Sequence, residues 1–269
     1  MTGKGDFTKI NPMAKIVAIC NQKGGVVKTS TAVSLSSGLA LEGRKCLLID
    51  LDPQGNATSG LGIDKHEVEK SIYHALLGDS PIQEVAQETF IPNLFVVPAN
   101  QDLSGTEIEL VSEMGREGKL KKLLSQVIDN YDFIIIDCPP SFGLLTVNAL
   151  TGSNSVLIPI QCEYYALEGL GQLMKTINLV KDNLNMNLEI EGVLMTMADF
   201  RTNLTQQVID EVKKHFGDKV YKTVIPRNIR LSEAPGFGKP IYFYDKDSEG
   251  AKKYTEFTKE FLLFNNLTI

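Results

Sequence analysis

Short apolar runs recur along this chain, and helical patterns separate them. The runs are rich in β-branched residues and are bounded by turn-forming residues, which predicts buried strands. The predicted strands are residues 15–20, 46–50, 93–100, 132–140, 155–160, 189–197 and 220–226. Continuous apolar strands, as opposed to alternating ones, imply a sheet covered on both faces. The pattern therefore predicts an α/β fold of three layers, with a mostly parallel, twisted sheet flanked by helices.

Two helical patterns are clear from their apolar spacing. The first follows the first predicted strand and ends near Gly43. The second covers residues 119–129, with apolar residues at 120, 123, 124, 127 and 128. That spacing gives one apolar stripe, which predicts an amphipathic helix packed on the sheet.

Composition favours a single domain. The chain has 269 residues, 43% of them hydrophobic, which is enough for one sizeable core. Residues 1–12 are polar and end in a proline, so we expect a flexible arm followed by one domain over residues 13–269. The four cysteines fall in or beside apolar runs and form no CxxC pair, which favours buried free thiols in a reducing compartment.

The overall charge argues against a dedicated nucleic-acid-binding protein. The formal net charge is -6 and the pI is about 5.2. A local basic patch remains compatible with that balance, because binding responds to the nearby field. The longest apolar runs are too short to cross a bilayer, so we expect no stable membrane insertion and a cytoplasmic protein.

Polar residues with phosphate and metal chemistry follow three of the predicted strands. They are Asn21–Thr29, Asp50–Asp52 and Asp137. Ligands of parallel α/β sheets bind at the carboxyl ends of the strands, so we expect these residues along one rim. A glycine loop before a helix supplies backbone N–H groups for phosphates, and a hydroxyl with carboxylates suits Mg²⁺. The combination predicts a nucleoside triphosphate site.

The loop departs from the ordinary phosphate-binding pattern G-x-x-x-x-G-K-[ST]. The two required glycines would fall on Gln22 and Val27. The variant pattern K-G-G-x-G-K-[ST] fits from Lys23 onward, except at Val27. With this loop, the chain resembles the ParA/MinD family of deviant Walker ATPases, and most closely the chromosomal ParA (Soj) partition proteins. The resemblance rests on the segments "NQKGGVVKTS", "LLIDLDPQGNATSGLG", "YDFIIIDCPPSFGLLTVNAL", "PIQCEYYALEGL" and "VIPRNIRLSEAPGFGKPI".

The resemblance implies roles for individual residues. Lys23 matches the signature lysine that reaches the partner subunit's nucleotide. Lys28 matches the lysine that contacts the β- and γ-phosphates. Asp52 matches the aspartate that holds the attacking water. The implied nucleotide-binding set is Lys23, Gly24, Gly25, Val26, Val27, Lys28, Thr29, Ser30, Pro226 and Asn228. The implied metal set is Thr29, Asp52 and Asp137.

The resemblance also implies a function. ATP with Mg²⁺ would favour a sandwich homodimer, the dimer would bind double-stranded DNA nonspecifically, and a ParB-type centromere-binding protein would stimulate hydrolysis. Arg201 and Arg230 match family positions tied to DNA binding, and we expect Lys252 to extend the same basic stripe. The resemblance also implies that the protein is associated with the nucleoid.

Val27 stands where the family has glycine. A branched side chain there is expected to crowd the phosphates, and an unusual backbone conformation would cost about 1–3 kcal/mol. We therefore expect Val27 to impair the nucleotide cycle, whereas Ser30, at a usual threonine position, keeps its hydroxyl.

Three other functions have some support in the sequence. A MinD-like membrane ATPase needs a basic amphipathic C-terminal helix, but no lysine follows Lys259, and we expect the nearby apolar residues to pack on the domain. Those residues are Phe257, Phe261, Leu262 and Phe264. An iron–sulfur reductase needs flanking motifs that Cys138 and Cys162 lack. A nucleotide-defective scaffold that still contacts DNA or a partner is the alternative that Val27 favours.

Overall fold

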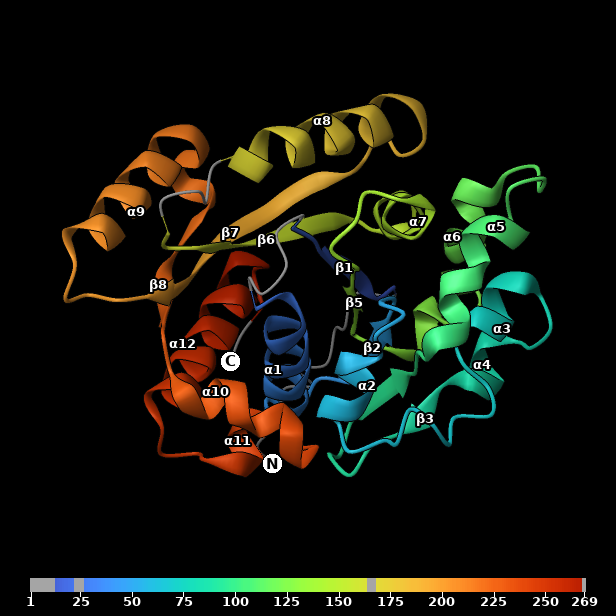
Figure 1. The fold of residues 1–269 in the computed structure, drawn as a ribbon, viewed down its shortest axis with the longest axis horizontal. Helices are drawn as coiled ribbons and strands as arrows, with labels where there is room; N and C mark the ends of the chain where they lie inside the picture. The colour runs from blue at the N-terminus through green and yellow to red at the C-terminus, as the bar shows by residue number, and fades with distance from the viewer. Residues whose placement is uncertain (1–12, 22–26, 164–167, 268–269) are drawn as a thin grey trace, which may run out of the picture.

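The fold is one parallel-rich sheet between two layers of helices, shown in Figure 1. The computed structural model describes residues 13–21, 27–163 and 168–267. The described strands form one sheet in the order β3-β4-β2-β5-β1-β6-β7-β8. Their bounds are β1 (Lys15–Ile19), β2 (Cys46–Asp50), β3 (Gln87–Glu88), β4 (Leu94–Val97), β5 (Phe133–Asp137), β6 (Ser155–Gln161), β7 (Glu189–Ala198) and β8 (Val220–Pro226). Among these strands β3 alone pairs antiparallel, which confirms the predicted three-layer α/β class.

Each face of the sheet has its own helical layer and its own apolar core. One core takes side chains from α1 (Lys28–Leu41), α2 (Asn56–Gly60), α10 (Ile229–Glu233), α11 (Ile241–Tyr244) and α12 (Glu249–Phe264). The other takes them from α3 (Ile72–Leu77), α4 (Ile82–Val85), α6 (Lys119–Leu124), α7 (Leu144–Gly152), α8 (Glu168–Asn183) and α9 (Asn203–Phe216). The short α5 (Thr106–Glu109) packs beside α3.

The two cores explain why the strands are apolar throughout. In β1, Val17 and Ile19 enter the core under α1 and α12, whereas Ile16 and Ala18 enter the opposite core. Successive side chains of a strand point to opposite faces, so a sheet covered on both sides needs apolar residues at every position. The strands therefore lack alternating apolar and polar residues because helices cover both faces of the sheet.

Some predicted boundaries were too generous. The strand predicted over residues 132–140 ends at Asp137, and the helix predicted over 119–129 ends at Leu124. Beyond Leu124 the backbone tightens into i to i+3 hydrogen bonds, as in Val127 N–H to the Leu124 carbonyl at 3.1 Å. The apolar spacing misled because Val127 is still buried although it has left the helix.

The C-terminal helix α12 packs on the domain, as expected for three of the four apolar residues. Phe257, Phe261 and Leu262 are fully buried. Phe264 is 42% exposed, so that part of the prediction was wrong, although its ring centroid lies 4.8 Å from that of Tyr221. The cysteine prediction is confirmed, because all four thiols are free and buried.

Close contact between α1 and α12 requires a glycine in α1. A Cβ at Gly38 would lie 2.4 Å from Thr258 Oγ1 and 2.8 Å from the Tyr242 hydroxyl. Gly171 in α8 is the opposite case, because a Cβ there meets no atom of the described chain within 4 Å.

We expect Gly38→Ala to lower the free energy of unfolding by about 1–3 kcal/mol, because the added methyl group overpacks the interface between α1 and α12. Gly171→Ala is the matched control and should raise it by about 0.4–1 kcal/mol, because alanine restricts the unfolded chain. Urea denaturation measures both values, and a shift of the same sign in both variants would contradict the packing argument.

Candidate functional site

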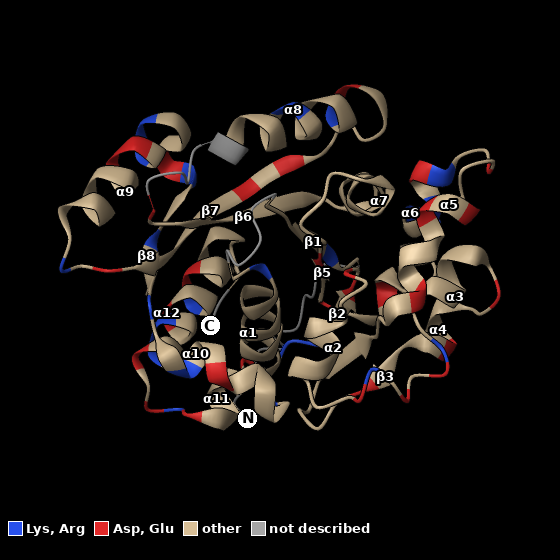
Figure 2. Ribbon diagram, viewed as in Figure 1, with Lys and Arg blue, Asp and Glu red and all other residues tan. Residues whose placement is uncertain are grey.

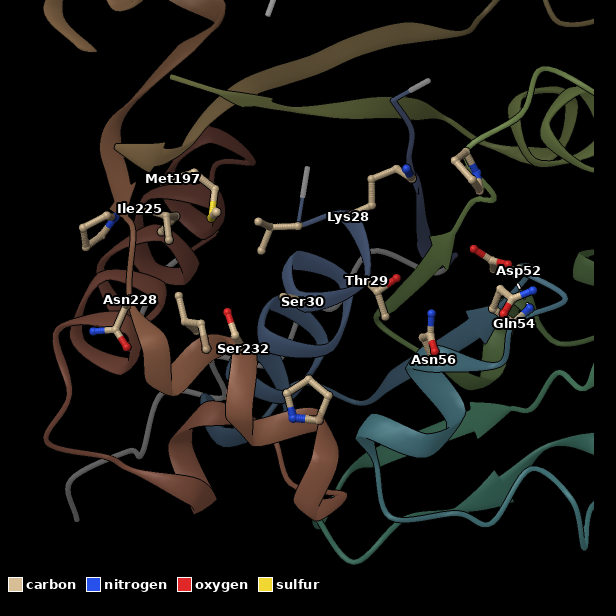
Figure 3. Close-up of a pocket in the computed structure, with 15 residues that line it drawn as sticks. Lys28, Thr29, Ser30, Asp52, Gln54, Asn56, Met197, Ile225, Asn228 and Ser232 are labelled. Carbon is tan, nitrogen blue, oxygen red and sulfur yellow. Dashed lines mark hydrogen bonds between the residues drawn. The ribbon is translucent and has the colours of Figure 1, made fainter. Parts of the chain in front are cut away.

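A pocket of about 400 Å³ opens at the carboxyl ends of the strands, around the first turn of α1. Figure 3 shows that Asp52, Gln54 and Asn56 lie on one side of this turn, and Met197, Ile225 and Asn228 on the other. The lining is completed by Val27, Lys28, Thr29, Ser30, Pro140, Pro226, Leu231, Ser232 and Pro235. The pocket thus has a polar, acidic side and a largely apolar side.

The start of α1 provides the cationic centre of the pocket. The first-turn N–H groups of a helix have no carbonyl partner within that helix, so they favour an anion. Lys28, the first residue of α1, is only 7% exposed. Burial lowers the pKa of its ammonium, while the nearby Asp137 carboxylate is the largest of the influences that raise it. An anion in the pocket would restore to Lys28 the charge stabilisation that burial removes.

Two buried carboxylates face each other across adjacent strands. Asp50 ends β2, Asp137 ends β5, and the two residues are paired in register. Both are completely buried. Burial raises the pKa of Asp50 to about 6, although hydrogen bonds from Thr58 lower this pKa. Burial, followed by the Asp50 charge, raises the pKa of Asp137 well above its usual range.

Asp137 has the features expected of a partner for a hydrated cation. Within the described chain, neither of its buried carboxylate oxygens has a hydrogen-bond partner. The neighbouring Thr29 side chain and Lys28 ammonium both favour its charged form. The described residues contain no group of three or more His, Cys, Asp or Glu side chains placed to hold a metal. A hydroxyl with one or two carboxylates fits Mg²⁺, which keeps several of its own waters.

The turn after β2 presents Asp52 to the pocket. Asp52 is 8% exposed, and its Oδ1 accepts a hydrogen bond from the Gln54 N–H at 2.9 Å. Gln54 and Asn56 also line the pocket and were not predicted from the sequence. Their position in "DPQGN", directly after Asp52, was the available signal.

The apolar side contains two predicted residues and several that were missed. Pro226 and Asn228 line the pocket as predicted, and Asn228 also caps α10 by accepting a hydrogen bond from the Arg230 N–H at 2.9 Å. Met197 and Ile225 were missed, because apolar residues near strand ends look like ordinary core residues in a sequence. Met197 has a positive φ of 55°, an uncommon conformation for a residue with a side chain.

Val27 lines the pocket in the left-handed backbone region. Its φ is 67° and its ψ is 25°, just before the first residue of α1. Glycine adopts this conformation freely, whereas a β-branched residue there is a true outlier. The expected backbone strain at Val27 is therefore present in the structure.

The remaining predicted loop residues divide into two groups. Thr29 and Ser30 line the pocket. Lys23, Gly24, Gly25 and Val26 lie outside the described residues.

The three predicted DNA-binding cations are exposed, and each is paired with a carboxylate. Arg201 lies beyond β7 and binds Asp199 at 2.6 Å. Arg230 on α10 binds Glu233 at 2.9 Å, and Lys252 on α12 binds Glu249 at 3.1 Å. In Figure 2, Lys and Arg positions are interspersed with Asp and Glu positions along the ribbon of these helices. The described surface is therefore mixed in charge at these positions.

Comparison with known proteins assigns the family. A protein-family model described as an AAA domain matches residues 14–190. The sporulation initiation inhibitor protein Soj of Bacillus subtilis is 60% identical over 248 residues, which cover 92% of this chain and 98% of that protein. The chain belongs to the ParA/MinD family of P-loop ATPases. The chromosome partitioning protein ParA of Myxococcus xanthus is 53% identical, with coverage of 93% of this chain and 88% of that protein.

A solved structure in this group shares the fold over nearly the whole chain. Cobyrinic acid a,c-diamide synthase from Mycobacterium smegmatis, solved with ADP and magnesium, has a TM-score of 0.81 and 38% identity. The alignment covers 92% of this chain and 93% of that one. In this chain Lys28, Thr29 and Asp52 line the pocket, and Asp137 acts on Lys28 from beside it. As for membranes, none of the helices in the described ranges is both long and apolar enough to span one.

We expect Val27→Gly to raise the affinity for a fluorescent ATP analogue by roughly 5- to 30-fold. The left-handed conformation costs a residue with a Cβ about 1–2 kcal/mol, and glycine also removes the side chain from the pocket.

Val27→Ala separates the two causes, because it keeps the Cβ but removes both γ-methyl groups. If strain dominates, alanine should bind the analogue as weakly as valine, whereas alanine should match glycine if crowding dominates. Equal affinity of all three proteins would show that Val27 is harmless.

Proposed function

We propose that this chain is a ParA-type ATPase of chromosome or plasmid partitioning that binds ATP with Mg²⁺. One observation carries the proposal: the buried Lys28 at the start of α1 shares a pocket with Asp52 and adjoins Asp137, at the ends of neighbouring strands. The names of the relatives, Soj and ParA, support partitioning as the process.

The proposed roles follow from position. The N–H groups of the first turn of α1 and the Lys28 ammonium would bind the phosphates, and the apolar side near Pro226 would enclose the base. Thr29, Asp52 and Asp137 would hold Mg²⁺, directly or through water, and the ion would neutralise charge on the phosphates. Asp52, at the rim of the pocket, would orient the attacking water.

The proposed cycle extends beyond a single subunit. ATP would favour a sandwich homodimer in which Lys23 reaches the partner's nucleotide. The dimer would bind double-stranded DNA nonspecifically over the nucleoid, and a ParB-type protein would stimulate hydrolysis. A subunit with net charge -6 offers few basic contacts, so two subunits would be needed to join Arg201, Arg230 and Lys252 into one surface.

One observation favours a second candidate function, a nucleotide-defective scaffold that still contacts DNA or a partner. That observation is the left-handed backbone at Val27, beside the phosphate-binding turn. Titration of the chain with a fluorescent ATP analogue and Mg²⁺ separates the two functions. Saturable binding supports the ATPase, and its absence in the chain that carries Val27, with recovery in Val27→Gly, supports the scaffold. The MinD-like membrane alternative gains no support, because α12 buries Tyr254, Phe257 and Phe261 in the domain.

Removal of the Asp52 carboxylate is expected to slow hydrolysis more than it weakens nucleotide binding. In a Val27→Gly background, Asp52→Ala should lower kcat about 100-fold or more, because a group that orients the attacking water acts in the transition state. The affinity for the ATP analogue should change by less than about threefold. Asp79→Ala, on an exposed turn, is the control. A loss of affinity as large as the loss of rate would instead make Asp52 a direct magnesium ligand.

Charge reversal at Arg230 should weaken DNA binding without changing nucleotide affinity. In the Val27→Gly background with ATP, we expect Arg230→Glu to lower affinity for a random-sequence duplex by more than about tenfold at low salt. Each lost phosphate contact should also flatten the log-log salt plot by about 0.9. Lys70→Glu, on the far side of the molecule beside Glu84, makes the same kind of sign change and should have little effect. Equally strong binding with and without ATP, unchanged by Arg230→Glu, would remove both the dimer switch and the surface.

A further inference from the structure

Asp50 is a buried carboxylate whose hydrogen bonds come from the turn after β2 and from α2. Its Oδ1 accepts the Asp52 N–H at 3.2 Å. Its Oδ2 accepts both the N–H of Thr58, at 2.8 Å, and the hydroxyl of Thr58, at 2.7 Å. Asp50 itself is not among the residues that line the pocket. Asp50 therefore accepts hydrogen bonds from both ends of the turn that begins at Asp52 and ends at Thr58.

The network continues from Thr58 to a third segment. The Thr58 hydroxyl accepts the Ala99 N–H at 3.0 Å, which ties α2 to the chain beyond β4. The turn is tightly fitted against that chain, because a Cβ at Gly55 would lie 2.7 Å from the Ala99 carbonyl oxygen. Gly55 also has a positive φ of 61°. The turn from Asp52 to Thr58 is thus held at both ends and packed along its length.

Burying the Asp50 carboxylate to hold this turn is unfavourable for the free energy of folding. Asp50 is paired in register with Asp137, so two carboxylates share one buried edge. Burial of a charge beside a like charge opposes folding unless hydrogen bonds compensate for it. Hydrogen bonds to a charged acceptor are stronger than neutral ones, and they therefore fix the donor groups more firmly. The cost is understandable if the position of Asp52 matters.

We infer that Asp50 is a positioning residue, whose carboxylate fixes the turn from Asp52 to Thr58 and so holds the Asp52 side chain at the rim of the pocket. The inference rests on the proposed function insofar as Asp52 serves hydrolysis. Asp137 makes a useful contrast. No hydrogen bond of ordinary geometry from the described chain reaches its oxygens, although the nearby Thr29 side chain favours its charged form, whereas three donors engage the oxygens of Asp50. Neither residue lines the pocket, but Asp137 keeps more acceptor positions for a hydrated cation than Asp50 does.

The first test uses the ligand-free Val27→Gly protein and amide hydrogen exchange. Asp50→Asn replaces one acceptor oxygen with a donor, so at least one bond from the turn must break. A hydrogen bond to a charged group is worth about 1.5–3 kcal/mol, so the amides of Asp52 and Thr58 should exchange roughly 10- to 100-fold faster. Asp129→Asn, an exposed residue on the far edge, removes the same charge and should leave both amides protected. Unchanged exchange in Asp50→Asn would overturn the inference.

The second test separates positioning from metal binding and from general stability. Asp50→Asn should lower kcat for ATP at least about tenfold, with less than a threefold change in affinity for the ATP analogue with Mg²⁺. Thr58→Val should lower kcat in the same sense, and Thr58→Ser, which keeps the hydroxyl, should restore it. An equal loss of affinity and kcat would indicate that Asp50 is a metal ligand. An unchanged kcat would indicate that Asp50 contributes only to the stability of the fold. Either outcome overturns the inference.

The two tests also distinguish this inference from the proposed function. If no variant binds or hydrolyses ATP, the proposed function fails, while hydrogen exchange still reports whether Asp50 holds the turn. If the Val27→Gly protein is active and Asp50→Asn is equally active, the proposed function stands and the positioning role is lost.

Discussion

The parallel pairing of β5 with β1 and β2 is the constraint on which the candidate site depends. In this register Asp137 is opposite Ile19 on one side and Asp50 on the other. The three strands end together, so the turn before α1 and the turn carrying Asp52 leave the sheet at the same edge. A register change of one residue would send each strand's side chains to the opposite face and would remove the carboxylates from this edge. The two apolar cores above and below the sheet oppose any such change.

The same register concentrates charge where water is excluded. Asp50 and Asp137 are fully buried side by side, and the Lys28 ammonium is nearly buried beside Asp137. Like charges at short range in a low-dielectric environment are unfavourable, so this edge is a place where stability is traded for a function that uses the charges. Hydrogen bonds compensate Asp50 internally. Asp137 is compensated only in part, by the Thr29 side chain and the Lys28 ammonium, and a hydrated divalent cation with a phosphate ligand would complete the compensation.

Val27 breaks the agreement between local preference and global fold that is typical of natural sequences. Everything around it is consistent: a buried strand precedes the loop, a long helix follows, and the helix begins with Lys28 and Thr29. Val27 is the one β-branched residue among those the structure describes with a positive φ, a conformation that glycine prefers. Such exceptions concentrate at functional sites, and this one lies in the pocket lining.

The sequence by itself determined the fold class and the approximate positions of every described strand except β3, and it predicted a nucleotide site at the ends of those strands. It could do so because apolar periodicity, glycine loops and carboxylates after strands are local signals. The end of α6 at Leu124, the partial exposure of Phe264 and the contributions of Met197 and Ile225 to the pocket were decided by the tertiary structure. These features depend on contacts between segments far apart in the chain, and packing against such segments overrides local preference. The bonds from Thr58 to Asp50 join residues only eight positions apart, but they too needed the folded turn to be seen.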